Sequence, residues 1–153
     1  MPRRSLARSA DADAILARLE RVTPDAGRRW GTMTPHEMLC HVTDAFRVAL
    51  GELHPPTLGV FGLRGPVPKW FALSVPLPWP HGIRGPAEVD PKQVGTKPVE
   101  LDADRTSAVA ATRRFIAEAS DQQSHPMFGP MSRADWLRWG WLHLDHHLRQ
   151  FGL

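Results

Sequence analysis

Hydrophobic residues recur at three- and four-residue intervals in four segments of the chain, which is the periodicity of amphipathic helices. In the first segment Ile15, Leu16 and Leu19 share one face, and Pro24 follows its end. The pattern predicts four helices, at about residues 11–22, 35–50, 103–119 and 133–150. No segment alternates regularly enough between apolar and polar residues to predict a β-strand.

Two of these helices begin with capping signals. Thr34 is suited to cap the second helix, Pro35 fits the first helical position, and Glu37 completes a capping box. Ser132 and Asp135 have the same relation at the start of the fourth helix. A glycine, which favours helix termination, follows each of these two helices: Gly51 and Gly152.

The same periodicity predicts which side chains are buried. On the second helix these are Met38, Val42, Ala45, Phe46 and Ala49; on the third, Val109, Ala110, Phe115 and Ile116; on the fourth, Leu137, Trp141, Leu144, Leu148 and Phe151.

Residues 52–100, between the second and third helices, have a different character. They contain ten of the fifteen prolines, which excludes long regular helix. They also contain Trp70, Phe71 and Trp79, which are too apolar to be left in water. We therefore expect an irregular Pro/Gly-rich crossover, with one short helix near 69–74, packed over one end of the other helices. The chain is predicted to be all-α, a four-helix bundle forming a single domain over residues 1–153.

Composition excludes several classes of protein. The 153 residues carry a net charge of +3, but the basic residues are scattered, so we do not expect nucleic-acid binding. No apolar run is long enough for a membrane span, and the basic N-terminus is not followed by an apolar signal segment. Cys40 is the single cysteine and cannot form an internal disulfide. These features predict a cytoplasmic protein.

The eight histidines are more informative than the charge. At about 100° per residue, His143 and His147 lie on one flank of the fourth helix, whereas His146 points toward solvent. His41 lies at the edge of the apolar face of the second helix. Three imidazoles from two facing helices can bind one zinc, nickel, copper or iron ion and leave a coordination position open. The alternative is that these are hydrogen-bonded histidines at the rim of the core.

Two sequence motifs resemble a known family. The stretch WGTMTPHEMLCH (residues 30–41) is similar to the start of the second helix in DinB-like proteins, a superfamily of four-helix bundles. The stretch HLDHHLRQFG (residues 143–152) resembles the end of their fourth helix. HPMFGPMS (residues 125–132) resembles the segment before it in a bacterial branch without an assigned function. These motifs cover about a quarter of the chain, and residues 52–100 match none of them.

The resemblance implies an antiparallel bundle that binds a metal ion, often zinc or nickel, and that is frequently a homodimer. By motif position the ligands are His41, His143 and His147. Some relatives are transferases or isomerases that use a low-molecular-weight thiol. The expected function is therefore a metal-dependent thiol S-transferase or hydrolase acting on a small molecule. A non-catalytic metal-binding or association bundle with a stress-related role is the alternative, and the sequence does not decide whether the protein is an enzyme.

Other residues are candidates for a supporting role. Gln150 lies on the flank of His143 and His147, where it can contact a bound ligand. Trp136, with Trp139 and Trp141, is expected to belong to the core and to the wall of the site. Asp44 and Glu37 are nearby acids, for which capping and solvated roles are the alternative. Cys40 faces away from the inferred site and is expected to be unreactive. Trp70 and Trp79 are placed to cover the open metal position, or simply to pack.

Overall fold

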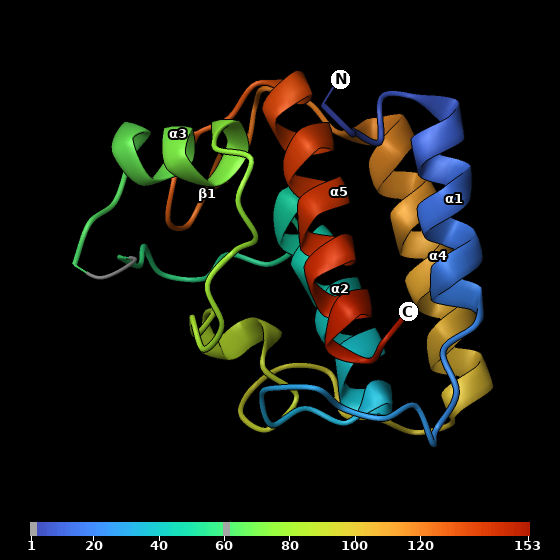
Figure 1. Ribbon diagram of the computed structural model, residues 1–153. Helices are drawn as coiled ribbons and strands as arrows, with labels where there is room; N and C mark the ends of the chain where they lie inside the picture. The colour runs from blue at the N-terminus through green and yellow to red at the C-terminus, as the bar shows by residue number, and fades with distance from the viewer. Residues whose placement is uncertain (1–2, 60–61) are drawn as a thin grey trace.

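The computed structural model describes residues 3–59 and 62–153 (Figure 1). The α-helices in these ranges are α1 (Ser9–Glu20), α2 (Pro35–Ala49), α3 (Pro66–Ser74), α4 (Leu101–Glu118) and α5 (Arg133–Gln150). A 3-10 turn, η1 (Ala87–Val89), and a hairpin of β1 (Ser124–His125) and β2 (Gly129–Pro130) complete the elements. None of the described helices is long and apolar enough to cross a membrane.

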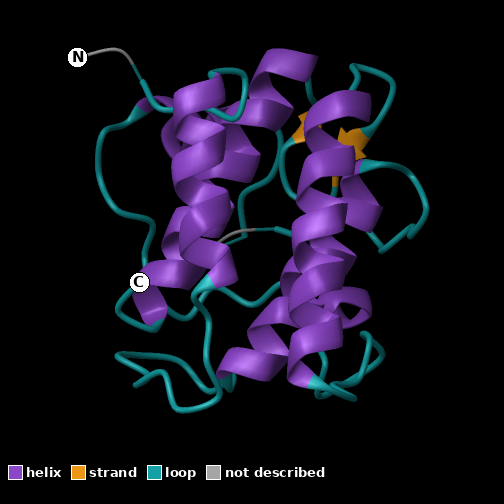
Figure 2. Ribbon diagram, turned by 90° about the vertical axis from the view of Figure 1, so that its right-hand side faces the viewer, coloured by secondary structure: helices purple, strands orange, loops and turns teal. Residues whose placement is uncertain are grey.

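The four long helices form the predicted bundle, with α3 and the rest of the crossover at its side (Figures 1 and 2). Each long helix packs against two others, in the order α1, α4, α2, α5 around the bundle. The two pairs that follow each other in sequence, α1 with α2 and α4 with α5, run antiparallel (Figure 1).

The crossover lets α2 and α4 run in the same direction as neighbours. His36 near the start of α2 bonds Asp104 near the start of α4, and Glu52 just beyond α2 pairs with Arg114 in the second half of α4. The helices α1 and α5 are likewise parallel, because Leu6 bonds the backbone of α5 near its start and Arg18 pairs with Asp145 near its end. Parallel neighbours need a long connection, and residues 50–100 supply it.

Capping fixes the two helices that carry the histidines of interest. The Thr34–Glu37 and Ser132–Asp135 capping boxes are both formed, with Pro35 at the first helical position. Gly51 and Gly152 follow the helix ends with positive φ angles, as C-terminal glycines do. The boundaries of α2 and α5 thus agree with those expected from the sequence.

The predicted apolar faces of α2 and α5 are buried as expected. On α4 the prediction is partly wrong, because Ala110 is exposed while Ala108 and Thr112 are buried. The buried face of α4 runs through Ala108, Thr112 and Phe115, at the spacing of successive helical turns. At the centre, Phe115 stacks on Phe46 with ring centroids 4.5 Å apart.

The crossover is held to the bundle at both ends. Asp44 on α2 is 1% exposed and accepts hydrogen bonds from the backbone N–H and the hydroxyl of Thr96. At the other end, Lys69 on α3 donates to the carbonyl of Pro130 and pairs with Asp135. The solvated role considered for Asp44 is therefore wrong, since its carboxylate ties the crossover to α2.

The hairpin is an element that the sequence did not predict. Its strands pair antiparallel, with Ser124 opposite Pro130 and His125 opposite Gly129. Strands of two residues are too short to show alternation, so the pattern carried no signal. The hairpin region also binds the crossover, since the backbone N–H groups of Leu58 and Gly65 donate to Pro126 and Met127.

Candidate metal centre

The structure brings together the three histidines that the sequence singled out. His41 comes from α2, and His143 and His147 come from successive turns of the antiparallel helix α5. One ring nitrogen from each can be chosen so that all three lie within 4.8 Å of one another. Both α5 histidines are buried and His41 is half-buried, so the cluster lies inside the protein.

Hydrogen bonds fix the orientation of two of the rings. His41 Nδ1 lies 2.7 Å from the carbonyl oxygen of Val89 in η1, and so donates its proton there. His147 Nδ1 lies 3.2 Å from Oε1 of Gln150, whose amide nitrogen donates to the carbonyl of Trp30. Because both Nδ1 atoms are engaged as donors, the Nε2 lone pairs are free to bind a metal. Such partners orient metal-ligating histidines and set their tautomer.

His143 is held by packing instead. Its ring stacks on Trp139, with centroids 4.8 Å apart and planes 14° from parallel. Its Nε2 lies 3.2 Å from Nε2 of His41. Two nitrogens bound to one tetrahedral zinc ion at about 2.0–2.1 Å are about 3.3 Å apart, so this separation suits a shared ion. Its Nδ1 is buried and lacks a hydrogen-bond partner within the described residues.

Burial sets the charge of the cluster. Desolvation is the main cause that lowers the pKa of His41, and it holds the pKa of His143 and His147 well below the usual value of 6.5. The positive charge that neighbouring imidazoles would carry lowers the pKa of the two α5 residues further. All three imidazoles are therefore neutral at pH 7, which is the state that binds a metal ion. The donor set and its protonation fit a divalent transition metal.

His146 departs from the prediction. Its side chain was expected to point to solvent, but it is half-buried, and burial lowers its pKa to about 4. Its ring lies 5.8 Å from that of Trp30, 6.0 Å from Trp79 and 6.1 Å from His81. The rings of Trp30, before α2, and of Trp79 and His81, in the crossover, cover the flank of α5 that would otherwise face water.

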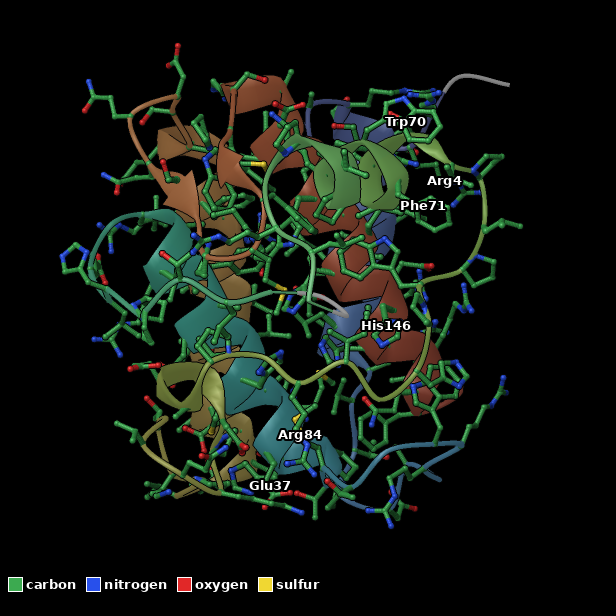
Figure 3. All side chains as sticks on the ribbon, turned by 90° about the vertical axis from the view of Figure 1, so that its left-hand side faces the viewer. Arg4, Glu37, Trp70, Phe71, Arg84 and His146 are labelled. Carbon is green, nitrogen blue, oxygen red and sulfur yellow. The ribbon has the colours of Figure 1, made fainter. Side chains whose placement is uncertain are left out.

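The tryptophans of α5 are buried, as expected of core and site-wall residues. Trp136 is fully buried among Phe115, His125 and Trp139, and it is Trp139 that reaches the triad. Trp79 lies over the site, 6.4 Å from the His143 ring, and its Nε1 donates to the carbonyl of Ala72. Trp70 is 63% exposed on α3 and does not cover the triad (Figure 3).

Cys40 lies beside His41 in sequence but not at the site. It is buried, and desolvation together with the charge of Asp104 raises the pKa of its thiol to about 12. Its side chain is directed to Asp104 on α4, which also bonds His36. The thiol is therefore protonated and unreactive at neutral pH, as the sequence suggested.

Sequence reasoning missed one group that contacts the triad and a buried carboxylate next to it in the chain. The carbonyl of Val89 reaches His41 from 48 residues away, and no side-chain pattern marks it. Next to it, Oε2 of Glu88 is buried and has no hydrogen-bond partner among residues 3–59 and 62–153. Both belong to a three-residue turn inside the crossover, where periodicity gives no information.

Comparison with known proteins gives one match. Searches of curated proteins and of solved structures find no match. The model of the family described as "Protein of unknown function (DUF1569)" matches residues 66–152, which is more than half of the chain. The match begins at the first residue of α3 and includes His143 and His147, while His41 lies before it. The chain therefore belongs to the DUF1569 family, which is part of the DinB/YfiT-like superfamily of metal-dependent proteins.

Proposed function

We propose that this protein binds one divalent transition-metal ion through His41, His143 and His147. The observation that carries the proposal is the convergence of three neutral imidazoles, two buried and one half-buried, of which His41 and His147 have their Nδ1 atoms already engaged. Zinc and nickel are the metals we expect, because imidazole nitrogen suits both. Three ligands leave room for one more, the arrangement of a catalytic rather than a structural site.

We further propose that the site acts on a small molecule, as a thiol S-transferase or a hydrolase. A bound divalent ion with three neutral ligands would supply Lewis acidity and make a thiol or a water molecule nucleophilic near neutral pH. The chain itself orients the imidazoles through Val89 and Gln150 and shields them from solvent with Trp79. Because Cys40 faces α4, a reacting thiol has to come from a second small molecule.

Metal analysis tests the binding site directly. We expect about one zinc or nickel ion per chain in protein purified without a polyhistidine tag, and loss of the ion in His41→Ala, His143→Ala and His147→Ala. His36→Ala is the matched control, because His36 lies on α2 near His41 but bonds Asp104. His146→Ala should also retain the metal. Retention of the ion by the three triad variants would refute the site.

Cobalt substitution separates the two reaction classes. If a thiol is the co-substrate, adding it to the cobalt-loaded protein should produce a sulfur-to-metal charge-transfer band, because the thiol binds as thiolate. A hydrolase should respond weakly to thiols and strongly to small anions. Absence of both responses would favour the alternative, a metal-binding bundle without turnover.

A further inference from the structure

A cavity of about 240 Å³ lies beside the triad, between residues 75–79 of the crossover and the outer face of α5. Its apolar walls include Leu77, Trp79, Trp141 and Leu142. An apolar cavity of about 150 Å³ accommodates benzene, so this one has room for a single ring with a short side chain. The cavity is thus large enough for a small organic molecule.

Arg138 gives the cavity a positive charge that no ion pair among the described residues neutralises. This half-buried guanidinium donates to two backbone carbonyl oxygens, those of Leu73 and Arg4. None of the ion pairs within residues 3–59 and 62–153 includes Arg138. Burial lowers the pKa of its guanidinium, and the positive charge of Arg3 lowers it further, while the negative charge of Asp11, which pairs with Arg8, offsets this only in part. A positive charge held in a partly apolar pocket favours an anionic partner.

The other charged groups at the cavity do not cancel this charge. Asp145 also lines it, but its carboxylate is already bound by Arg18 at 2.7 Å and lies 3.5 Å from Arg149. The guanidinium of Arg4 lies 5.5 Å from the ring of Trp141, on the face that carries α3 (Figure 3). The neighbouring crossover contributes no acid, because residues 53–87 contain neither Asp nor Glu.

We propose that this cavity binds a small organic acid, with its carboxylate on Arg138 and its apolar ring between Trp79 and Trp141. A guanidinium presents a planar fork of N–H donors that matches a carboxylate, and indole rings provide flat apolar contact. The cavity is distinct from the metal site, because Trp79 and His146 stand between it and the triad. It would therefore hold its ligand next to the metal without using the metal for binding.

The test uses phenylacetate as the probe and the full-length protein freed of metal by a chelator. Isothermal titration calorimetry should show binding of phenylacetate, at least tenfold weaker binding of the uncharged phenylacetamide, and little effect of His143→Ala. In ¹H–¹⁵N spectra the indole signals of Trp79 and Trp141 should shift on binding, while that of the buried Trp136 should not. Equal affinity for the acid and the amide would overturn the proposal, as would dependence on His143 or the metal.

Two variants on α5 sharpen the test. Arg138→Gln should weaken phenylacetate binding at least tenfold, because it removes the charge that faces the cavity. Arg133→Gln is the matched control, since Arg133 lies at the start of the same helix and donates to Ile116, outside the cavity. Thermal melting checks that both variants are folded. If Arg138→Gln does not fold, the comparison of acid with amide on the wild type still decides the proposal. Unchanged affinity in folded Arg138→Gln would refute it.

Discussion

At the scale of single residues, Gln150 shows how one side chain can serve a site without belonging to the ligand set. It is 3% exposed, accepts from His147 Nδ1 and donates to the carbonyl of Trp30. These two bonds fix the tautomer of a proposed ligand and attach the loop before α2 to the end of α5. Its position was predicted correctly from the helical phase, but its second bond was not, because Trp30 is 120 residues away.

Replacing Gln150 by leucine should weaken metal binding without removing a ligand. Loss of a hydrogen-bond partner of a metal-ligating histidine commonly costs about 10- to 100-fold in affinity, and we expect this range for Gln150→Leu. Competition with a chromophoric chelator at pH 7.5 measures the change. Gln122→Leu, at an exposed glutamine in the loop before β1, is the control. An affinity equal to that of the wild type would show that the Gln150 bond does not support the site.

At the scale of elements, the hairpin depends on a half-buried histidine. His125 Nδ1 accepts the backbone N–H groups of Met127 and Phe128, and its ring stacks on Phe128 with centroids 4.3 Å apart. Burial lowers the pKa of this imidazole from 6.5 to about 3. The imidazole of His125 is therefore neutral in the folded protein. Protonation of its Nδ1 would also remove the acceptor of the Met127 and Phe128 N–H groups, which closes the turn of the hairpin.

This arrangement predicts a loss of stability in acid. The unfolded chain binds a proton at His125 below about pH 6.5, whereas the folded chain does so only near pH 3. The free energy of unfolding should therefore fall between these values, by up to about 1.4 kcal/mol per pH unit for this group. In His125→Asn the side-chain oxygen can still accept the turn N–H groups but does not titrate.

Urea denaturation at pH 7, 6 and 5 measures the effect. The decrease in unfolding free energy from pH 7 to 5 should be smaller in His125→Asn than in the wild type by about 1–2 kcal/mol. His54→Asn, at an exposed histidine in the crossover, should behave as the wild type. The same pH dependence in all three proteins would contradict a neutral His125 in the folded protein.

The elements also show what the sequence could reveal. Capping boxes and the four-residue spacing of His143 and His147 are local features, so α2 and α5 and the side-by-side placement of these two histidines were predicted correctly. Their role as metal ligands stays a prediction. The stacking of Trp139 on His143 is equally local, and it agrees with the expectation that the tryptophans of α5 belong to the core and the wall of the site. The burial of His146 could not be predicted in this way, because it depends on contacts with Trp79 and His81. These residues are distant in sequence and belong to the crossover, where no hydrophobic periodicity indicates the fold.

At the scale of the whole molecule, α3 leaves an apolar surface uncovered. Val67, Trp70 and Phe71 on its outer side are 66%, 63% and 55% exposed (Figure 3). Large apolar side chains gathered on one short helix are typical of an association surface. The homodimer expected from the family resemblance remains a prediction, and α3 is where we expect the two copies to meet.

Sedimentation analysis tests this association. The wild type should be a dimer at tens of micromolar, and the double variant Trp70→Ser, Phe71→Ser should be a monomer, because it removes the largest exposed apolar groups of α3. Val99→Ser is the control, since Val99 is 87% exposed but lies away from α3 in the chain, just before α4. A wild-type monomer, or a double variant that stays dimeric, would exclude α3 as the interface.

The crossover that separates α2 from α4 has a further consequence for the assembly of the triad. His41 and His143 are 102 residues apart in the sequence. An ion bound by both would therefore cross-link two positions separated by two thirds of the chain. Bringing two groups so far apart in sequence to one point costs loop-closure entropy on the order of 4–5 kcal/mol, which folding of the bundle has to supply before one ion can bind both. His143 and His147, one helical turn apart, can meet the ion early in folding. His41 can bind the ion only after the part of the chain that carries α2 has packed against α5. Coordination by His41 would therefore be the last step of folding.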